Sequence, residues 1–146
     1  MVQKIAIAND HAGLALKQDL VTHFVSRVEW LDLGAYTPDS VDYAAYGFAM
    51  GDAITSGQVT RGVLICGSGV GISIAANRNP AVRAALCMNS TMARLARLHN
   101  DANVVCLGAR LVGVALAIDI VETFLNTAFE GGRHTARVEQ LSQKGH

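Results

Sequence analysis

Cys66 stands directly before a glycine-rich turn, residues 67–71, with the sequence Gly-Ser-Gly-Val-Gly. An ionised thiol can act as a base or a nucleophile, and N–H groups at a helix N-terminus favour the thiolate and cradle an anion. We therefore interpret Cys66 as a reactive thiol acting on a substrate whose negative charge the turn holds. In the alternative, Cys66 is a buried hydrophobic residue and the glycines only make room for a turn. Cys87, which ends another predicted strand, is the rival thiol, because Cys106 lies in mid-strand.

The turn does not match three better-known loops. The spacing of Gly67, Gly69 and Gly71 departs from the dinucleotide fingerprint, and no Gly-Lys-Ser/Thr follows as a P-loop would require. A cysteine phosphatase loop needs an arginine where this chain has Ile72. The residues therefore favour none of these classes.

Asp10 and His11 are candidates to work with Cys66. They directly follow an apolar run at residues 4–9 that we predict to be a strand. Ligands of open α/β sheets bind at the carboxyl ends of the strands, so we expect both side chains at the same sheet edge as Cys66. A carboxylate beside an imidazole can move protons or bind a sugar hydroxyl. In the alternative, Asp10 only caps a helix.

Basic residues later in the chain suit an anionic ligand. Arg133 and Arg137 are four residues apart, which places them on one face of a helix starting near Arg133. Two guanidinium groups near a helix N-terminus suit a phosphate dianion, although such a pair can also be a surface feature. Arg110 lies just beyond a predicted strand, and His99 ends a predicted helix, where a terminal cap is its alternative role.

Strand patterns that alternate with helical patterns must position these residues. The predicted strands are residues 4–9, 30–33, 63–66, 83–87 and 103–108. Such alternation indicates an α/β fold. We predict one domain over residues 1–146, a three-layer α/β/α sandwich with a five-stranded, parallel, doubly wound (Rossmann-like) sheet and residues 63–66 as its central strand.

The composition excludes several classes of protein. The net charge is zero, there are no basic runs for nucleic acid, and no apolar run is long enough to span a membrane. With no signal peptide and no paired cysteine spacing, we expect free thiols in a cytoplasmic protein. Neither Cys-x-x-Cys nor His-x-x-x-His occurs, so no metal site is predicted. Five arginines but no carboxylate lie between Asp52 and Asp101, which fits an anionic small molecule.

Motifs from five parts of the chain occur together in one known family. They are Asp10-His-Ala-Gly13, Cys66-Gly-Ser-Gly-Val-Gly71 with Ala75-Ala-Asn77, His99-Asn-Asp101, Gly108-Ala-Arg110 and Glu130-Gly-Gly-Arg-His-x-x-Arg137. From Ile5 to about Leu141 the chain resembles the type B ribose-5-phosphate isomerases, within the family that also holds galactose-6-phosphate and allose-6-phosphate isomerases. The fold of that family is similar to the one predicted above.

The resemblance implies a reaction and a role for each residue of the turn. The family interconverts ribose 5-phosphate and ribulose 5-phosphate, with Cys66 as the base that moves a proton between C1 and C2 of the open sugar phosphate. Ser68 and the amides of Gly67, Gly69 and Gly71 would stabilise the enediolate. No hydride or electron leaves the substrate, so no cofactor is required.

The remaining site residues also follow from the resemblance. Asp10 and His99 would assist ring opening and proton transfer. The substrate contacts would be His11, Arg110, Arg133 and Arg137 for the phosphate, and Tyr43 and Asn100 for the sugar. The family builds each site across a dimer interface, with His99, Asn100 and Arg110 from the neighbouring chain, which implies a homodimer, with a tetramer as the alternative.

Three positions depart from the pattern of the family. Ser68 stands where threonine is common but keeps the hydroxyl, and Ala44 replaces a frequent proline. One branch of the family uses a glutamate in place of the cysteine base, and Ile72 occupies that position here, which indicates the cysteine branch.

Two other functions stay open at this point. The protein could isomerise another phosphorylated sugar, such as allose 6-phosphate, galactose 6-phosphate or a tetrose phosphate, since loop residues 36–42 would set the pocket length. It could also be a non-catalytic sugar-phosphate-binding protein on the same fold. The presence of Cys66, Asp10 and His99 together argues against that second function.

Overall fold

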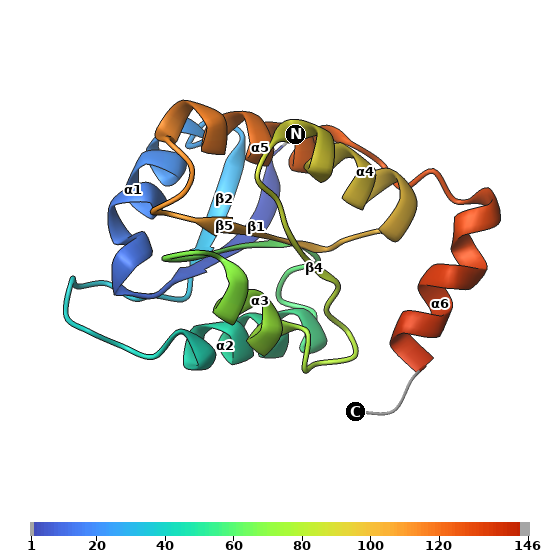
Figure 1. Cartoon of the computed structure of the whole chain (residues 1–146), viewed down its shortest axis with the longest axis horizontal. Coiled ribbons are helices and arrows are strands. Elements are labelled where there is room, and N and C mark those ends of the chain that lie inside the picture. Colours follow the sequence, from blue (N-terminus) through green and yellow to red (C-terminus); the bar gives the residue numbers. More distant parts are fainter. Residues whose placement is uncertain (1, 144–146) are drawn as a thin grey trace.

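A sheet of five strands forms the centre of the computed structural model, which describes residues 2–143 (Figure 1). The strands are β1 (Gln3–Asn9), β2 (Val28–Asp32), β3 (Gly62–Cys66), β4 (Ala84–Leu86) and β5 (Val104–Gly108), in the order β2-β1-β3-β5-β4. Every neighbouring pair runs parallel. β3 and β5 are buried along their whole length, as expected of short apolar runs covered on both faces. The predicted parallel sheet with residues 63–66 at its centre is confirmed.

Helices cover both faces of the sheet (Figure 1). One face carries α1 (Leu14–His23), α4 (Ser90–Asn100) and α5 (Val114–Asn126), and the other carries α2 (Tyr43–Thr55) and α3 (Val70–Ala76). Successive strand side chains point to opposite faces and so enter two separate cores. Val63 joins Ile120 in one core, and Leu64 joins Met50 and Ile72 in the other. The predicted three-layer architecture is confirmed.

The last helix, α6 (Thr135–Gln143), belongs to neither helical layer. It follows a short 3-10 turn, η2 (Gly132–His134), and stands to one side of the layers, beyond α4 (Figure 1). Val138 is the buried residue of this helix. Within residues 2–143, no helix combines the length and the apolar composition needed to cross a membrane.

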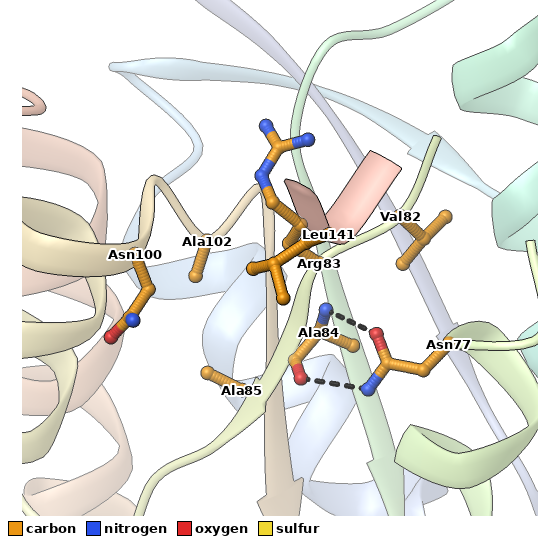
Figure 2. Close-up of a pocket in the computed structure, with 8 residues that line it drawn as sticks. All are labelled: Asn77, Val82, Arg83, Ala84, Ala85, Asn100, Ala102 and Leu141. Atoms are coloured by element: carbon orange, nitrogen blue, oxygen red, sulfur yellow. Dashed lines mark hydrogen bonds between the residues drawn. The ribbon is translucent and has the colours of Figure 1, made fainter. Parts of the chain in front are cut away.

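The edge strand β4 is shorter than the predicted residues 83–87. The Asn77 side chain occupies its outer edge, donating to the Ala84 carbonyl at 3.0 Å and accepting from the Ala84 N–H at 2.8 Å (Figure 2). These bonds satisfy backbone groups that an edge strand would otherwise leave unpaired. A cavity of about 390 Å³ lies between β4 and Leu141 of α6. The charged residue that lines this cavity, Arg83, already donates hydrogen bonds to Asp101. The lining of this cavity therefore offers no free reactive group.

Lys17 of α1 is buried and anchors the loop between β2 and α2. Its Nζ donates to Asp32 Oδ1 at 3.0 Å and to the Ala35 carbonyl oxygen at 2.5 Å. Farther along the same loop, the Val41 N–H donates to His11 Nδ1 at 3.2 Å. The loop is thus tied both to the first helix and to the 3-10 turn η1 (His11–Gly13), which follows β1.

Replacing Lys17 with Met tests this anchor. The variant leaves the buried Ala35 carbonyl without its donor and Asp32 without its ion pair. Because an unpartnered buried polar group costs about 1–3 kcal/mol, we expect the free energy of unfolding in urea to fall by that amount. Lys4→Met, at an exposed position of β1, is the control and should change it by no more than about 0.5 kcal/mol. Equal stability of the two variants would contradict the anchoring role.

Candidate active site

A cavity of about 320 Å³ lies at the carboxyl edge of the sheet. The second strand, β2, lies on one side of β1, and the chain then crosses to β3 on the other side of β1. The direction in which strands are added therefore reverses at β1, which is where ligands of such sheets bind. The residues that line the cavity are Asp10, Tyr43, Cys66, Gly67, Ser68, Gly71, Arg110 and Leu111. All of them except Leu111 were predicted as site residues from the sequence. We call Asp10, Tyr43, Cys66, Ser68 and Arg110 the Cys66 cluster.

The backbone of the glycine-rich turn contacts the thiol directly. Cys66 ends β3 with 4% of its surface exposed, and the Gly69 N–H donates to its Sγ at 3.2 Å. Such a donor stabilises negative charge on sulfur. Gly69 has a φ of +79°, and a Cβ there would lie 2.5 Å from Leu86 Cδ1 and 2.9 Å from the Leu107 carbonyl carbon. Glycine is therefore required at position 69 for the chain to aim this N–H at the thiol.

Ser68 and Tyr43 present polar groups to the same cavity. Ser68 Oγ accepts from the Val70 N–H at 3.2 Å, which leaves its hydroxyl hydrogen to donate to a ligand. Tyr43 is the first residue of α2, and its ring lies against Gly71. A Cβ on Gly71 would lie 2.6 Å from that ring, so this glycine lets Tyr43 reach the cavity.

Asp10 both caps a turn and lines the cavity. Its Oδ1 accepts from the Ala12 N–H at 3.0 Å, which is the capping role considered from the sequence. Its position at the end of β1 also brings the carboxylate to the Cys66 cluster. The neighbouring His11 accepts a hydrogen bond at Nδ1 from Val41, so neutral His11 carries its proton on Nε2. His11 is not among the residues that line the cavity.

Arg110 corrects the grouping implied by the family resemblance. The resemblance assigned Arg110 to the neighbouring chain together with His99 and Asn100. Here the Arg110 N–H donates to the Gly67 carbonyl of its own chain at 3.0 Å, and its side chain lines the Cys66 cavity. The reason is that Arg110 follows β5, and the carboxyl ends of parallel strands meet at one edge.

His99 and Asn100 lie toward the other edge of the sheet. They end α4, and the chain then enters β5 at Val104. In the β3–β5 register, Cys66 is level with Gly108 at the opposite end of β5. The two ends of β5 are four residues apart, and at about 3.3 Å per residue the distance between them is roughly 13 Å. We infer that one chain does not bring these two residues to its own Cys66.

A second correction concerns the two arginines near the C-terminus. The resemblance named only His99, Asn100 and Arg110 as coming from the neighbouring chain, which left Arg133 and Arg137 with Cys66. Instead, Arg137 joins His99 and Asn100 in a separate cavity of about 300 Å³, because α6 stands beside the end of α4 (Figure 1). Arg133 immediately precedes His134, another residue of that cavity. We call His99, Asn100, Arg133, His134 and Arg137 the His99 cluster.

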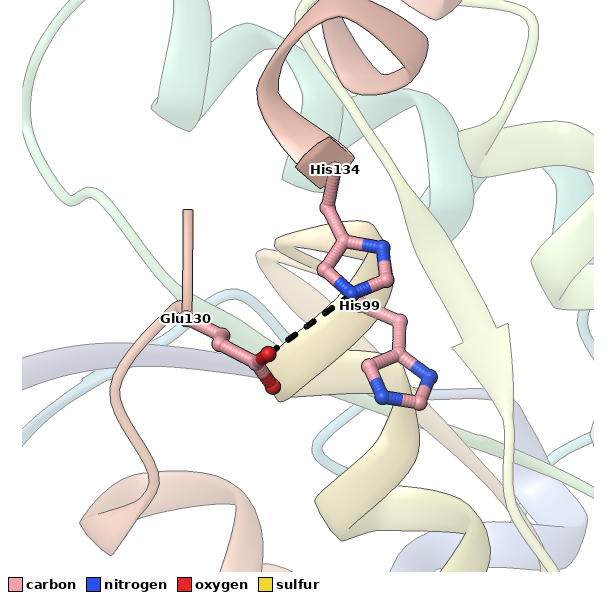
Figure 3. A group of neighbouring side chains, drawn as sticks. All are labelled: His99, Glu130 and His134. Carbon is pink, nitrogen blue, oxygen red and sulfur yellow. Dashed lines mark ion pairs between the residues drawn. The ribbon is translucent and has the colours of Figure 1, made fainter. Parts of the chain in front are cut away.

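His134 has a prominent place in this cluster that the sequence did not reveal. Its ring stacks on His99 with centroids 4.5 Å apart, and its Nε2 lies 3.9 Å from Glu130 Oε1 (Figure 3). Burial, then the charges of His99 and Arg133, lower the pKa of His134, so it is neutral at pH 7 and its contact with Glu130 is not a true ion pair. Its buried Nε2 has no hydrogen-bond partner among the described residues. The sequence signal that could have drawn attention to His134 is its four-residue spacing from Glu130.

The other two thiols are poorly suited to chemistry. Burial raises the pKa of Cys87 to about 11. Burial also raises the pKa of Cys106 well above its usual value, with smaller contributions from Cys87 and Cys66. Both thiols are therefore protonated at neutral pH, and neither lines the cavity at the carboxyl edge.

Comparison with known proteins identifies the class to which this fold and site belong. Residues 5–141 match the ribose/galactose isomerase family, and the chain belongs to that family. It is 45% identical to ribose-5-phosphate isomerase B of Escherichia coli over 142 residues, covering 97% of this chain and 95% of that protein. The predicted family and the predicted class of enzyme, a sugar-phosphate isomerase, are confirmed.

Solved structures agree with this assignment. Ribose-5-phosphate isomerase B of Clostridium thermocellum is 48% identical and matches with a TM-score of 0.94, covering 97% of this chain and 96% of that one. The enzyme of Mycoplasma genitalium, whose structure holds bound ribulose 5-phosphate, is 40% identical with a TM-score of 0.92 and covers 98% and 96% of the two chains.

Alkylation distinguishes the three thiols. Brief treatment of the folded protein with iodoacetamide at about pH 8 should modify Cys66 and leave Cys87 and Cys106 unmodified, because burial keeps those two thiols protonated and out of reach. Mass spectrometry of the digested protein measures the extent at each site. In urea all three should react, which controls for peptide detection. Modification of Cys87 as fast as Cys66 would contradict the assignment.

Proposed function

We propose that this protein interconverts ribose 5-phosphate and ribulose 5-phosphate, with Cys66 as the base. The observation that carries the proposal is the Cys66 thiol at the switch point of the sheet, with the Gly69 N–H donating to its sulfur. The identity to ribose-5-phosphate isomerase B of E. coli supports the choice of substrate, and so does the ribulose 5-phosphate bound in the M. genitalium enzyme.

Cys66 and the turn carry out the proton transfer in this mechanism. The Cys66 thiolate takes the proton from C2 of the open-chain aldose, the C–H electron pair forms the C1=C2 double bond, and the carbonyl electrons move to O1. The resulting enediolate receives hydrogen bonds from the Ser68 hydroxyl and the turn amides, and one such donor contributes roughly 10²–10³-fold in rate. Cys66 then returns the proton to C1, while O2 loses its hydroxyl proton and O1 gains one. The atoms balance without a cofactor.

We further propose that each site combines the Cys66 cluster of one chain with the His99 cluster of a second chain. The two clusters lie toward opposite edges of the sheet, and a symmetric dimer brings one of each together twice. Asp10 and the partner's His99 then assist ring opening, while Tyr43 and the partner's Asn100 line the sugar. The phosphate is held by His11 and Arg110 of one chain, and by Arg133 and Arg137 of the other.

The cellular setting is also part of the proposal. The mechanism needs a reduced thiol, and the free Cys66, Cys87 and Cys106 suit a reducing compartment, so we infer a cytoplasmic enzyme. Its partners are a phosphorylated sugar and a second copy of this chain, with no role for a membrane or nucleic acid.

Formation of ribulose 5-phosphate tests the proposed reaction. We expect Cys66→Ala to lower kcat by roughly 10²–10⁴-fold, which is the usual contribution of a general base. Calorimetry should show that the variant still binds the substrate. The matched control Cys87→Ala should keep most of the wild-type rate. A panel with allose 6-phosphate, galactose 6-phosphate and erythrose 4-phosphate, ranked by kcat/KM, identifies the preferred sugar. Wild-type binding without turnover of any of them would favour a sugar-phosphate-binding protein instead.

Mixed dimers test the shared site. Cys66→Ala and His99→Ala should each be nearly inactive alone. After chain exchange, about half of the dimers are mixed and each contains one intact site, so roughly a quarter of wild-type activity should return. Mixing Cys66→Ala with Arg110→Ala should restore nothing, because both residues belong to the same cluster of a chain. Activity restored by mixing Cys66→Ala with Arg110→Ala, but not by mixing Cys66→Ala with His99→Ala, would show that Arg110 and His99 have exchanged places between the two clusters.

A further inference from the structure

We infer that His99, Glu130 and His134 form a binding site for a divalent transition metal, zinc in particular, and that the bound metal inhibits the enzyme by occupying His99. Their potential ligand atoms all lie within 4.8 Å of one another (Figure 3). Two imidazoles and one carboxylate are a ligand set that zinc uses in proteins. The inhibitory part rests on the proposed function, because it requires His99 to serve in isomerisation.

His134 is the fixed part of this site. Its side chain is buried, with 6% of the residue exposed, and its Nε2 lies inside the protein without a hydrogen-bond partner among residues 2–143. That nitrogen points toward Glu130 at 3.9 Å (Figure 3). A buried, unpartnered nitrogen with a carboxylate in front of it leaves a place for a ligand that accepts its lone pair.

Glu130 and His99 must both move to complete the site. A metal lies in the plane of each imidazole that binds it, so His99 must turn out of its stack on His134, where the two ring planes are 19° apart. Zinc–ligand distances of about 2.0–2.2 Å place the donors of a tetrahedral site roughly 3.3 Å apart, so the largest separation must shorten by about 1.5 Å. Glu130 can supply part of this movement, because half of its side chain is exposed and it makes no other described ion pair. His99 is half-buried, so solvent can fill the fourth position.

The surrounding charges make this a reversible site rather than a structural one. Arg137 lines the same cavity and Arg133 precedes His134, so two guanidinium groups oppose a dication. Glu130 supplies the single negative charge of the ligand set. Loss of Glu130 should therefore weaken metal binding strongly, whereas the proposed mechanism gives Glu130 no part in isomerisation.

Titration with Co²⁺, a spectroscopic substitute for zinc, tests the site without any sugar. We expect calorimetry to show one Co²⁺ per chain, with weak visible bands and no intense sulfur-to-cobalt band in the near ultraviolet. Glu130→Gln should weaken binding at least tenfold, since loss of an outer-shell partner alone often costs that much. Glu139→Gln, at an exposed position of α6, is the matched control and should bind like wild type. Cys66→Ala should also retain the site.

The isomerase rate in the same buffer tests inhibition. Zn²⁺ should inhibit the wild type and Glu139→Gln alike, EDTA should restore the rate, and Glu130→Gln should need at least tenfold more zinc while keeping its basal rate. No binding, unchanged binding by Glu130→Gln, or a sulfur-to-cobalt band lost in Cys66→Ala would overturn the site. Binding without inhibition would overturn the inhibitory role. A protein with no isomerase activity would overturn the proposed function and the inhibitory role, while the cobalt titration would still decide the site.

Discussion

The common direction of the strands is the constraint on which the site depends. Because every strand in the sheet runs the same way, the loops that follow the strands all lie at the carboxyl edge and the loops that precede them lie at the amino edge. The two edges therefore carry different side chains. Turns after β1, β3 and β5 place Asp10, Cys66 and Arg110 at the carboxyl edge, where the cavity lies. The end of α4 places His99 toward the amino edge, because a helix in this fold returns the chain to the start of the next strand. The separation into two clusters thus follows from the topology.

The end of β5 also sets the shape of the turn after Cys66. The Ala109 N–H donates to the Cys66 carbonyl at 2.8 Å, and a Cβ on Gly108 would lie 2.6 Å from the Ser68 carbonyl oxygen. The two strand ends therefore fit closely because Gly108 has no side chain. This contact holds Ser68 and the Gly69 N–H in place and delivers Arg110 to the same cavity, so the thiol and the guanidinium are positioned by one piece of backbone.

Much of the fold could be predicted because strand and helix patterns are local signals, and the ends of the predicted strands locate Asp10 and Cys66. Tyr43 was predicted as a site residue only through the family resemblance. The carboxyl ends of parallel strands lie at one edge of the sheet, and Arg110 follows the predicted strand at residues 103–108. This rule alone predicts Arg110 beside Cys66, whereas the family resemblance assigned Arg110 to the neighbouring chain. His134 could not be placed this way. Its contact with His99 depends on the backbone conformation at Gly131 and Gly132, both with positive φ, and no periodic pattern encodes that conformation.

The helix α6 is weakly attached to its own chain, and in the proposed dimer its contacts with the substrate link substrate binding to association of the chains. Val138 is the buried residue of this helix, and the helix presents Arg137 beside His99. In the proposed site, a sugar phosphate contacts these residues of one chain and Arg110 of the other. A ligand that binds only the assembled pair stabilises that pair by mass action. In the proposed dimer, substrate binding and association of the two chains would therefore be thermodynamically coupled, because the phosphate ligands would be divided between the chains.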